Sequence, residues 1–329
     1  MNNSSPDTAA SHIAVCGALA YDQICRTSDP IIVNEQPLLN AKLHKITESF
    51  GGCAGNILYN LARLNNRGVL VTCTGAQDDA PYLKQLRQLQ LDLSHCLRLP
   101  GLNTARAIIF TDPNELQFTG FYPGPIPESA DWQSHLQRVN FTDIQLFLQA
   151  PYPSHIMTQT LSYVRGLTET PLRVFAPGQY ADQLTPAEAA QLIGLSDWVI
   201  GNAYEVEKLL SHHPLMDKVV VTTHGAEPIE VQCRDLSVKT IAVPAVTDSV
   251  DPTGCGDAFI AGVCHALLQR CEFNSERLRR VGDCVDNNTF SILQDAILLG
   301  CALAADCLAQ QGPQHHPISL FGAPQFSNG

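Results

Sequence analysis

The chain has 329 residues, of which 45% are hydrophobic and 16% charged, so it can bury one large core with a small appendage. Its formal net charge of −12 argues against proteins that bind nucleic acid or anionic membranes without sequence specificity. The charge does not argue against a nucleotide site, because backbone dipoles can hold phosphates on an acidic protein. No uninterrupted apolar run approaches the roughly 18 residues of a membrane span. We therefore expect neither nucleic acid nor a membrane as partner.

The N-terminal residues and the cysteines indicate the compartment. Residues 1–11 are polar and lack the basic start and apolar core of a signal peptide. We expect them to form a disordered tail, followed by a domain over residues 12–329. The 12 cysteines are scattered through apolar segments, without pairs at the spacing of zinc ligands. This pattern predicts reduced, mostly buried thiols in a cytoplasmic protein.

The first predicted strand is followed by an acidic residue. Residues 12–18 form an apolar run typical of a buried strand, and Asp22 comes shortly after it. Open α/β sheets bind ligands just beyond the carboxyl ends of their strands. A solvated turn aspartate is the alternative interpretation of Asp22. Residues 23–49 are irregular and indicate an excursion away from the core.

A glycine-rich stretch opens the first predicted helix. Gly51 and Gly52 allow a close approach of the backbone, and Asn56 on the first helical turn can hydrogen-bond a ligand hydroxyl. A strand at residues 69–74 and a helix at residues 82–89 follow.

A second excursion spans residues 103–124. Residues 104–111 and 116–120 alternate like the strands of a hairpin, with turn residues between them. Phe121 and Tyr122 end the hairpin beside further turn residues. These aromatic side chains can cover a flat ligand, or they can pack under the hairpin, which is the more common arrangement.

Strand and helix patterns then alternate regularly. Strands are predicted at residues 144–148, 172–176, 198–201 and 218–223, with a β pair at 229–233 and 237–243. Helices are predicted at residues 156–164, 185–195, 202–210, 257–268 and 288–310. Hydrophobic strands in repeated β-α units predict a mainly parallel sheet covered by helices on both faces. The fold class is therefore α/β, with a small β excursion inserted near the N-terminus.

The stretch around which the chain is organised is Asp-Pro-Thr-Gly-Cys-Gly-Asp at residues 251–257, directly before an apolar helix. Its small residues can point backbone N–H groups and a helix N-terminus at one spot, which would attract an anion. Asp257 lies at the edge of that spot, an arrangement that suits phosphoryl transfer. The alternative is an ordinary Asp helix cap after a glycine-rich turn. The loop alone leaves both interpretations open.

Four stretches in order resemble the ribokinase-like (PfkB) carbohydrate and nucleoside kinases over essentially the whole chain. They are Gly51-Gly52-x-Ala-Gly55-Asn56, Asn202-x-x-Glu205, Thr223-x-Gly225 and Asp251-Pro-Thr-Gly-Cys-Gly-Asp257. The resemblance implies a three-layer α/β/α core with a small β lid formed by about residues 23–49 and 103–124. It also implies ATP and Mg²⁺ as cofactors, K⁺ in many members, and a homodimer contact through the lid.

Residue roles follow from the same resemblance. Asp257 corresponds to the catalytic base that takes the proton from the substrate hydroxyl. The N–H groups of Gly254, Cys255 and Gly256 correspond to the anion hole. Cys255 stands where small or aliphatic residues are common, but only its N–H is required there.

The nucleotide and cation positions are implied in the same way. Asn202 and Glu205 correspond to the motif that organises Mg²⁺ through waters. Thr223 and Gly225 correspond to the nucleotide-binding turn, with Gly312 near the adenine. Asp251 and Thr253 correspond to the positions of a monovalent-cation site.

Among these kinases, the chain most resembles the bacterial adenosine kinases of ribokinase type. Asp22, Gly51, Gly52 and Asn56 correspond to residues that grip the ribose hydroxyls. In the predicted lid, Arg106 and Phe121 correspond to substrate-binding residues, and Phe121 would stack on the purine. Ala107 stands where those kinases carry a second stacking aromatic residue.

Three hypotheses follow from the sequence. The first is an ATP-dependent kinase that phosphorylates the primary hydroxyl of a ribosyl substrate, converting adenosine to AMP. The second is a sugar kinase of the same fold that acts on a free pentose or hexose such as ribose or fructose. The third is a nucleotide-binding protein without activity, which the intact Asp257 and its preceding glycines disfavour.

Overall fold

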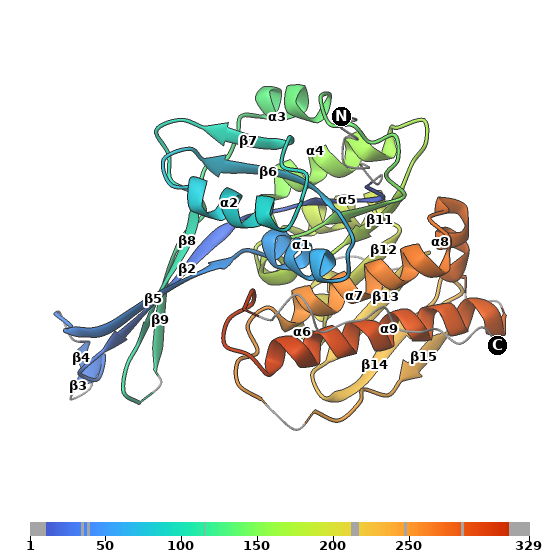
Figure 1. The fold of residues 1–329 in the computed structure, drawn as a ribbon. Helices are drawn as coiled ribbons and strands as arrows, with labels where there is room; N and C mark the ends of the chain where they lie inside the picture. Colours follow the sequence, from blue (N-terminus) through green and yellow to red (C-terminus); the bar gives the residue numbers. More distant parts are fainter. Residues whose placement is uncertain are drawn as a thin grey trace, which may run out of the picture.

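Within the described residues, nine strands form the central sheet of the computed structural model (Figure 1). The structure describes residues 11–33, 36–37, 40–114, 116–211, 217–246, 249–283 and 286–315. The strand order is β15-β14-β13-β12-β11-β10-β1-β6-β7. The strands are β1 (Ile13–Cys16), β6 (Val69–Gly75), β7 (Cys96–Leu99), β10 (Leu146–Gln149), β11 (Leu172–Phe175), β12 (Trp198–Asn202), β13 (Val219–His224), β14 (Glu227–Gln232) and β15 (Val238–Ile241). Only the pairs β13–β14 and β14–β15 of this sheet are antiparallel, so the sheet is mainly parallel, as predicted.

Helices cover both faces of the sheet. Because successive strand residues point to opposite faces, Ile13 and Val15 of β1 belong to one core and Ala14 and Cys16 to the other. The first core contains α1 (Cys53–Arg63), α2 (Ala80–Gln88), α7 (Cys255–Arg270), α8 (Ser275–Val281) and α9 (Asn287–Leu308). The second contains α3 (Ser129–Leu136), α4 (Ser154–Arg165), α5 (Pro186–Leu195) and α6 (Ala203–Leu210). Burial on both faces explains the near-continuous apolar strands of the sequence.

The longest helix, α9, packs along α7. A Cβ atom on Gly262 of α7 would lie 2.7 Å from the Cα of Gly300 of α9, so the two helices touch through their glycines. By length and composition alone, α9 could cross a membrane. Leu293, Ala296 and Ile297 of α9 are nevertheless buried in the first core. We therefore interpret α9 as a core helix of the kinase-like fold.

A separate four-stranded sheet projects from the body (Figure 1). It consists of β5 (Leu43–Gly51), β2 (Ala20–Thr27), β8 (Ala105–Thr111) and β9 (Gln117–Tyr122), in that order. The short strands β3 (Ile32–Val33) and β4 (Gln36–Pro37) form a further pair. These strands come from the two excursions of the sequence, and we call this four-stranded sheet the lid.

The structure differs from the sequence-based expectations in several details. The strand predicted to begin at residue 144 begins at Leu146, and β7, α3 and α8 were not predicted. β7 has only four residues, and the charged Arg98 interrupts its apolar pattern. Arg98 forms an ion pair with the buried Asp79. Cys233 is disulfide-bonded, so the expectation of wholly reduced thiols is wrong there. Residues 1–10 of the predicted tail lie outside the described residues.

Candidate active site

A cavity of about 330 Å³ lies at the carboxyl ends of the parallel strands. Its lining residues are Cys53, Pro151, Ala176, Gly178, Gln179, Ile200, Gly201, Asn202, Glu205, Thr223, Gly254, Gly256, Asp257, Phe259 and Ile260. The cavity thus joins the ends of β12 and β13 to the N-terminus of α7. No lysine, arginine or histidine is among these described lining residues, whereas two carboxylates are. The site therefore favours a ligand that brings cations with it.

The N-terminus of α7 points backbone donors toward this cavity. Gly254 is its N-cap and has a φ of 82°, which favours glycine, and a Cβ atom there would lie 2.4 Å from the Cβ of Pro313. The amides of Gly254 and Gly256 donate to no atom in the described part of the chain. The N–H of Cys255 donates to the Pro252 carbonyl oxygen at 3.2 Å. Two of the three predicted anion-hole donors are therefore unengaged, and the third is shared with a turn.

Asp257 lies on the first turn of α7, and its side chain contacts α1. The Asn56 Nδ2 donates to the Asp257 Oδ2 at 2.8 Å. Burial is the main reason that the pKa of Asp257 is raised to about 7; the charges of Glu205 and Asp22 contribute in the same direction, against the hydrogen bonds from Asn56 and Cys53. A carboxyl whose pKa lies near neutrality is suited to accept a proton from an alcohol at neutral pH.

Asn202 and Glu205 form a reciprocal cap at the start of α6. The Asn202 Oδ1 accepts from the Glu205 N–H at 2.9 Å, and the Glu205 carboxylate accepts from the Asn202 N–H at 3.1 Å. Burial raises the pKa of Glu205, and this effect outweighs the hydrogen bond from the Asn202 N–H, which stabilises the charged form. A residue that only caps a helix does not need to be buried. Glu205 therefore places a partly desolvated charge on the cavity wall as well as capping the helix.

Of the remaining predicted nucleotide residues, Thr223 lines the cavity, whereas Gly225 and Gly312 do not. Thr223 lines the cavity opposite Asn202 on the neighbouring strand. Gly225, with a φ of 68°, forms the turn between β13 and β14 and does not line the cavity. Gly312 does not line it either; its N–H donates to the Asp251 Oδ2 at 3.0 Å.

Asp251 holds the loop before α7 together. Its Oδ1 accepts from the Thr253 N–H at 2.9 Å, and its Oδ2 accepts from Gly312. Burial alone would raise the pKa of Asp251, but these hydrogen bonds outweigh it and hold the pKa below the ordinary value. Both carboxylate oxygens are therefore engaged with protein donors.

Asp22 and the glycine pair meet where β2 and β5 enter the body. Burial and the charge of Asp251 raise the pKa of Asp22 to about 6. A Cβ atom on Gly51 would lie 2.1 Å from the Asp22 Oδ2, so only glycine leaves room for this carboxyl. Gly52 has a φ of 81°, and a Cβ atom there would lie 2.6 Å from the Ala18 carbonyl oxygen. The glycines therefore set the position of Asp22 and the start of α1.

The lid register separates the two predicted lid residues. Asp22 pairs with Ala107, which pairs with Phe121, so these three side chains share one face of the lid. Arg106 is one position away and therefore points to the other face. There its guanidinium pairs with Glu48 and Asp78 and lies over the Tyr21 ring. The structure brings Phe121, but not Arg106, to the face that carries Asp22.

Two residues at this site were not predicted. Gln314, which is 6% exposed, donates through its Nε2 to the Asn56 Oδ1 at 2.9 Å and to the Tyr82 Oη at 2.7 Å. Tyr82 donates to the Gly51 carbonyl oxygen at 2.6 Å. No local pattern identifies these side chains, because their partners lie far away in the sequence. Their shared contacts with Asn56 and Gly51 appear only in three dimensions.

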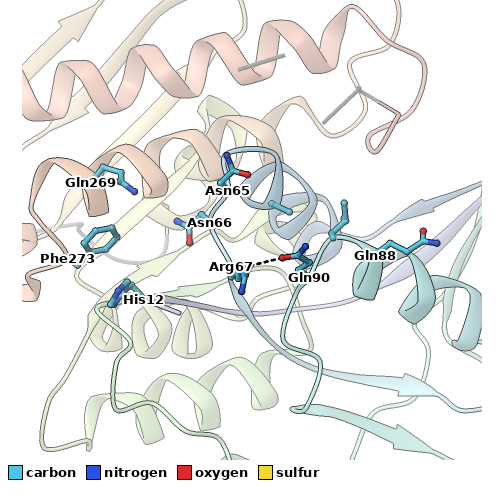
Figure 2. Close-up of a pocket in the computed structure, with 10 residues that line it drawn as sticks. His12, Asn65, Asn66, Arg67, Gln88, Gln90, Gln269 and Phe273 are labelled. Atoms are coloured by element: carbon cyan, nitrogen blue, oxygen red, sulfur yellow. Dashed lines mark hydrogen bonds between the residues drawn. The ribbon is translucent and has the colours of Figure 1, made fainter. Parts of the chain in front are cut away.

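A second cavity, of about 470 Å³, lies at the opposite ends of the strands, near the starts of β1 and β6. Figure 2 shows amide side chains around it, with Arg67 donating to the Gln90 Oε1 at 2.7 Å. Its described lining contains no carboxylate, in contrast to the first cavity. Of the two cavities, only the first therefore has carboxylates in its described lining.

Comparisons with known proteins agree with this architecture. The model of a family described as pfkB family carbohydrate kinase matches residues 10–319. The chain is 24% identical over 268 residues to the nucleoside kinase of Methanothermobacter thermautotrophicus, covering 79% of this chain and 83% of that protein. The solved structure of Burkholderia thailandensis nucleoside kinase in complex with inosine is 25% identical in sequence, with a TM-score of 0.72, covering 92% of this chain and 93% of that one. The ribokinase of Thermotoga maritima, at 20% identity and a TM-score of 0.68, shares the fold over 93% of this chain and 95% of its own.

Proposed function

The chain belongs to the pfkB family of carbohydrate kinases, and from this premise we propose that it transfers the γ-phosphate of ATP to the 5′-hydroxyl of a purine nucleoside. Adenosine, which becomes AMP, is the first candidate acceptor. Inosine is the second, because it is bound in the structure of the Burkholderia thailandensis relative. The curated Methanothermobacter relative, a nucleoside kinase, supports the same substrate class.

The main support for a nucleoside substrate is the cross-strand pairing that places Asp22, Ala107 and Phe121 side by side on one face of the lid. Neighbouring strands lie about 4.8 Å apart, so Phe121 lies roughly 10 Å from Asp22 across the small Ala107. A ribose held at Asp22 would direct its base toward Phe121, whose ring is 48% exposed. A free sugar has no flat group for this ring to cover.

The proposed reaction uses the charged groups of the cavity in distinct roles. Asp257 accepts the proton of the 5′-hydroxyl as the oxygen attacks the γ-phosphorus of ATP, and ADP leaves with the bond to its β-phosphate oxygen broken. The unengaged amides of Gly254 and Gly256 stabilise the charge on the transferring phosphoryl group. Closure of the lid excludes water, which would otherwise compete as acceptor.

The cavity fits a magnesium-bound nucleotide. Glu205 brings oxygen donors to the cavity wall and Asp257 adds negative charge, and no group of three metal-ligating side chains is present among the described residues. Mg²⁺ commonly binds through substrate phosphates, waters and one or two carboxylates. We propose that Glu205 holds its waters, and the ion would supply charge neutralisation on the phosphates. The Asp251 oxygens already accept two N–H bonds, so the K⁺ site stays a prediction and no step depends on it.

A test of the substrate class compares acceptors in an assay of ADP release. Wild-type protein is expected to turn over adenosine or inosine with Mg²⁺-ATP at a higher kcat/KM than ribose or fructose. Phe121→Ala is expected to raise the KM for the nucleoside by roughly 5- to 150-fold, since stacking of an aromatic ring on a base contributes about 1–3 kcal/mol. The same variant should leave the KM for ATP unchanged.

The matched control for this variant is Phe118→Ala. Phe118 lies on the same strand, is 62% exposed, and faces the other side of the lid. Its replacement should leave the nucleoside KM within about twofold. Efficient turnover of a free sugar without turnover of any nucleoside would instead favour a sugar kinase.

We also propose that the chain is cytoplasmic, where ATP and nucleosides are both present.

A further proposal is that the chain dimerises through the lid. β5 and β9 are the edge strands of the lid, and each leaves one row of backbone groups unpaired within the described residues. Pairing of these edges between two copies would satisfy those groups. We expect twice the chain mass in analytical ultracentrifugation at micromolar concentration, and a monomer at all concentrations would contradict this prediction.

A further inference from the structure

A chain of buried and partly buried hydrogen bonds connects the C-terminal segment to the predicted base. Gln314 follows Gly312 by two residues, and its Nε2 donates to both Asn56 and Tyr82. Its Oε1 accepts from the Gln85 Nε2 of α2 at 2.8 Å. Asn56 in turn donates to Asp257 at 2.8 Å. Two hydrogen bonds, with Asn56 between them, therefore connect the amide of Gln314 to the carboxyl that would take the substrate proton.

The ends of this network fix the direction of every bond in it. The Gly51 carbonyl oxygen can only accept, so the Tyr82 hydroxyl must donate to it and is left to accept from Gln314. Gln314 therefore presents its N–H₂ group, and the Asn56 oxygen must face that group. The Asn56 N–H₂ group is then directed at Asp257. A carbonyl more than 200 residues away in sequence from Asp257 thus determines which end of Asn56 the carboxyl meets.

We propose that Gln314 is a positioning residue that holds the Asn56 amide with its N–H toward Asp257 and so keeps the base in its ionised form. This inference rests on the proposed function, in which Asp257 receives the proton of the nucleoside 5′-hydroxyl. An N–H donated to a carboxylate stabilises the charged form, whereas the Asn56 oxygen in the same place would stabilise the protonated acid. Gln314 selects between these two orientations.

The groups that face Asp257 act on its pKa in opposite directions or are neutral. Asp22 of β2 and Glu205 of α6 are negative and raise its pKa, and the Cys53 thiol and Asn56 of α1 hydrogen-bond it. Tyr82 of α2 is a neutral phenol, because burial holds its pKa far above neutrality. No positive side chain opposes the two carboxylates in the described lining of the cavity. The amide of Asn56 is consequently a principal stabiliser of the charge on Asp257.

The test compares the pH dependence of kcat/KM for the nucleoside in wild type, Gln314→Leu and Gln314→Glu. The leucine has a similar size and no donor, so Asn56 is free to turn. The glutamate has the same shape, and when it is ionised it only accepts, so Asn56 must then turn its N–H₂ group toward residue 314. The negative charge of the glutamate raises the pKa of Asp257 in addition. Activity is lost as pH falls through the pKa of the base, so a higher pKa moves this acidic limb to higher pH. We expect a shift of about one unit in Gln314→Leu, which is a roughly tenfold lower rate on the acidic side, and a larger shift in Gln314→Glu.

Gln85→Leu is the matched control, because it removes a partly buried hydrogen bond from the same Gln314 side chain without freeing Asn56. Its melting temperature should fall, but by less than that of Gln314→Leu, which loses three hydrogen bonds, while its acidic limb stays at the wild-type pH. An unchanged limb in both Gln314 variants, or an equal shift in Gln85→Leu, would overturn the inference.

A second readout separates this inference from the proposed function. The pKa of Asp257 can be followed by carboxyl NMR titration without any acceptor, and it should rise in both Gln314 variants. Absence of turnover with every nucleoside would refute the proposed function, while the titration would still decide whether Gln314 acts on Asp257. An unchanged titration in folded Gln314→Glu would overturn the positioning role.

Discussion

Asp257→Asn is expected to lower kcat with the nucleoside by about 10²- to 10⁴-fold, the range that a general base contributes. Asparagine has nearly the same shape but cannot take a proton from the attacking hydroxyl. The N-terminus of α7 and the Asn202–Glu205 pair remain in place, so binding of Mg²⁺-ATP should persist. Turnover by ADP release and ATP affinity by calorimetry measure the two quantities separately.

The same substitution should stabilise the fold at alkaline pH. Because burial raises the folded pKa of Asp257 from 3.8 to about 7, the unfolded chain releases its proton first, and stability falls as pH rises between these values. Above the folded pKa, the charged carboxyl costs on the order of 1–4 kcal/mol, which asparagine avoids. The melting temperature of Asp257→Asn should therefore exceed that of wild type at pH 8, and the two should converge near pH 4.

Asp235→Asn is a matched control, since it makes the same change in the exposed turn between β14 and β15. It should retain wild-type turnover and show no gain in stability at pH 8. If Asp257→Asn kept near-full activity, the proposed proton transfer would be wrong. If it lost activity together with ATP binding, Asp257 would be a structural residue of the nucleotide site.

Gly254→Ala is expected to lower kcat/KM for ATP by about 10²- to 10³-fold, as the loss of an oxyanion donor does in other enzymes. The added Cβ would lie 2.4 Å from the Cβ of Pro313, so the loop before α7 or the C-terminal segment must move. Movement of Pro313 would disturb both Gly312 on Asp251 and Gln314 on Asn56. The donors at the helix N-terminus would then no longer converge on the phosphoryl group.

Gly101→Ala separates this steric effect from backbone strain. Gly101 has a φ of 75°, close to the 82° of Gly254, but a Cβ atom there meets no other atom within 4 Å. Both variants should lose about 1–2 kcal/mol of stability through the left-handed backbone. Only Gly254→Ala should lose activity, measured as steady-state rates at a temperature well below both melting transitions. Equal activity of the two variants would show that Pro313 yields without consequence.

Much of the architecture could be predicted because it is written in local patterns. Strands buried on both faces, such as β13, appear as continuous apolar runs, and the capping box of α6 appears as Asn202 followed by Glu205 three residues later. The glycines of the loop at residues 251–257 predict a helix N-terminus there. Short elements such as β7 could not be predicted, because four residues that include an arginine show no clear alternation of apolar and polar residues.

The lid illustrates the limit of such patterns. Alternation predicts that β8 and β9 are strands, but which residues stand beside Asp22 depends on the register with β2, which lies some 80 residues earlier. A shift of one residue would exchange Arg106 for Ala107 on that face. Sequence resemblance gave Arg106 and Phe121 the same role, and only the register separates them.

The sequence by itself determined the α/β class, the kinase family, and the place of Asp257 on the first turn of a helix, because these depend on residues adjacent in the chain. The tertiary structure decided how that carboxyl is charged and oriented. Asp22, Glu205 and Asn56 converge on it from three separate elements, and Gln314 reaches Asn56 from the C-terminal segment. Desolvation and hydrogen-bond direction are properties of such a convergence, and no local stretch of sequence encodes them.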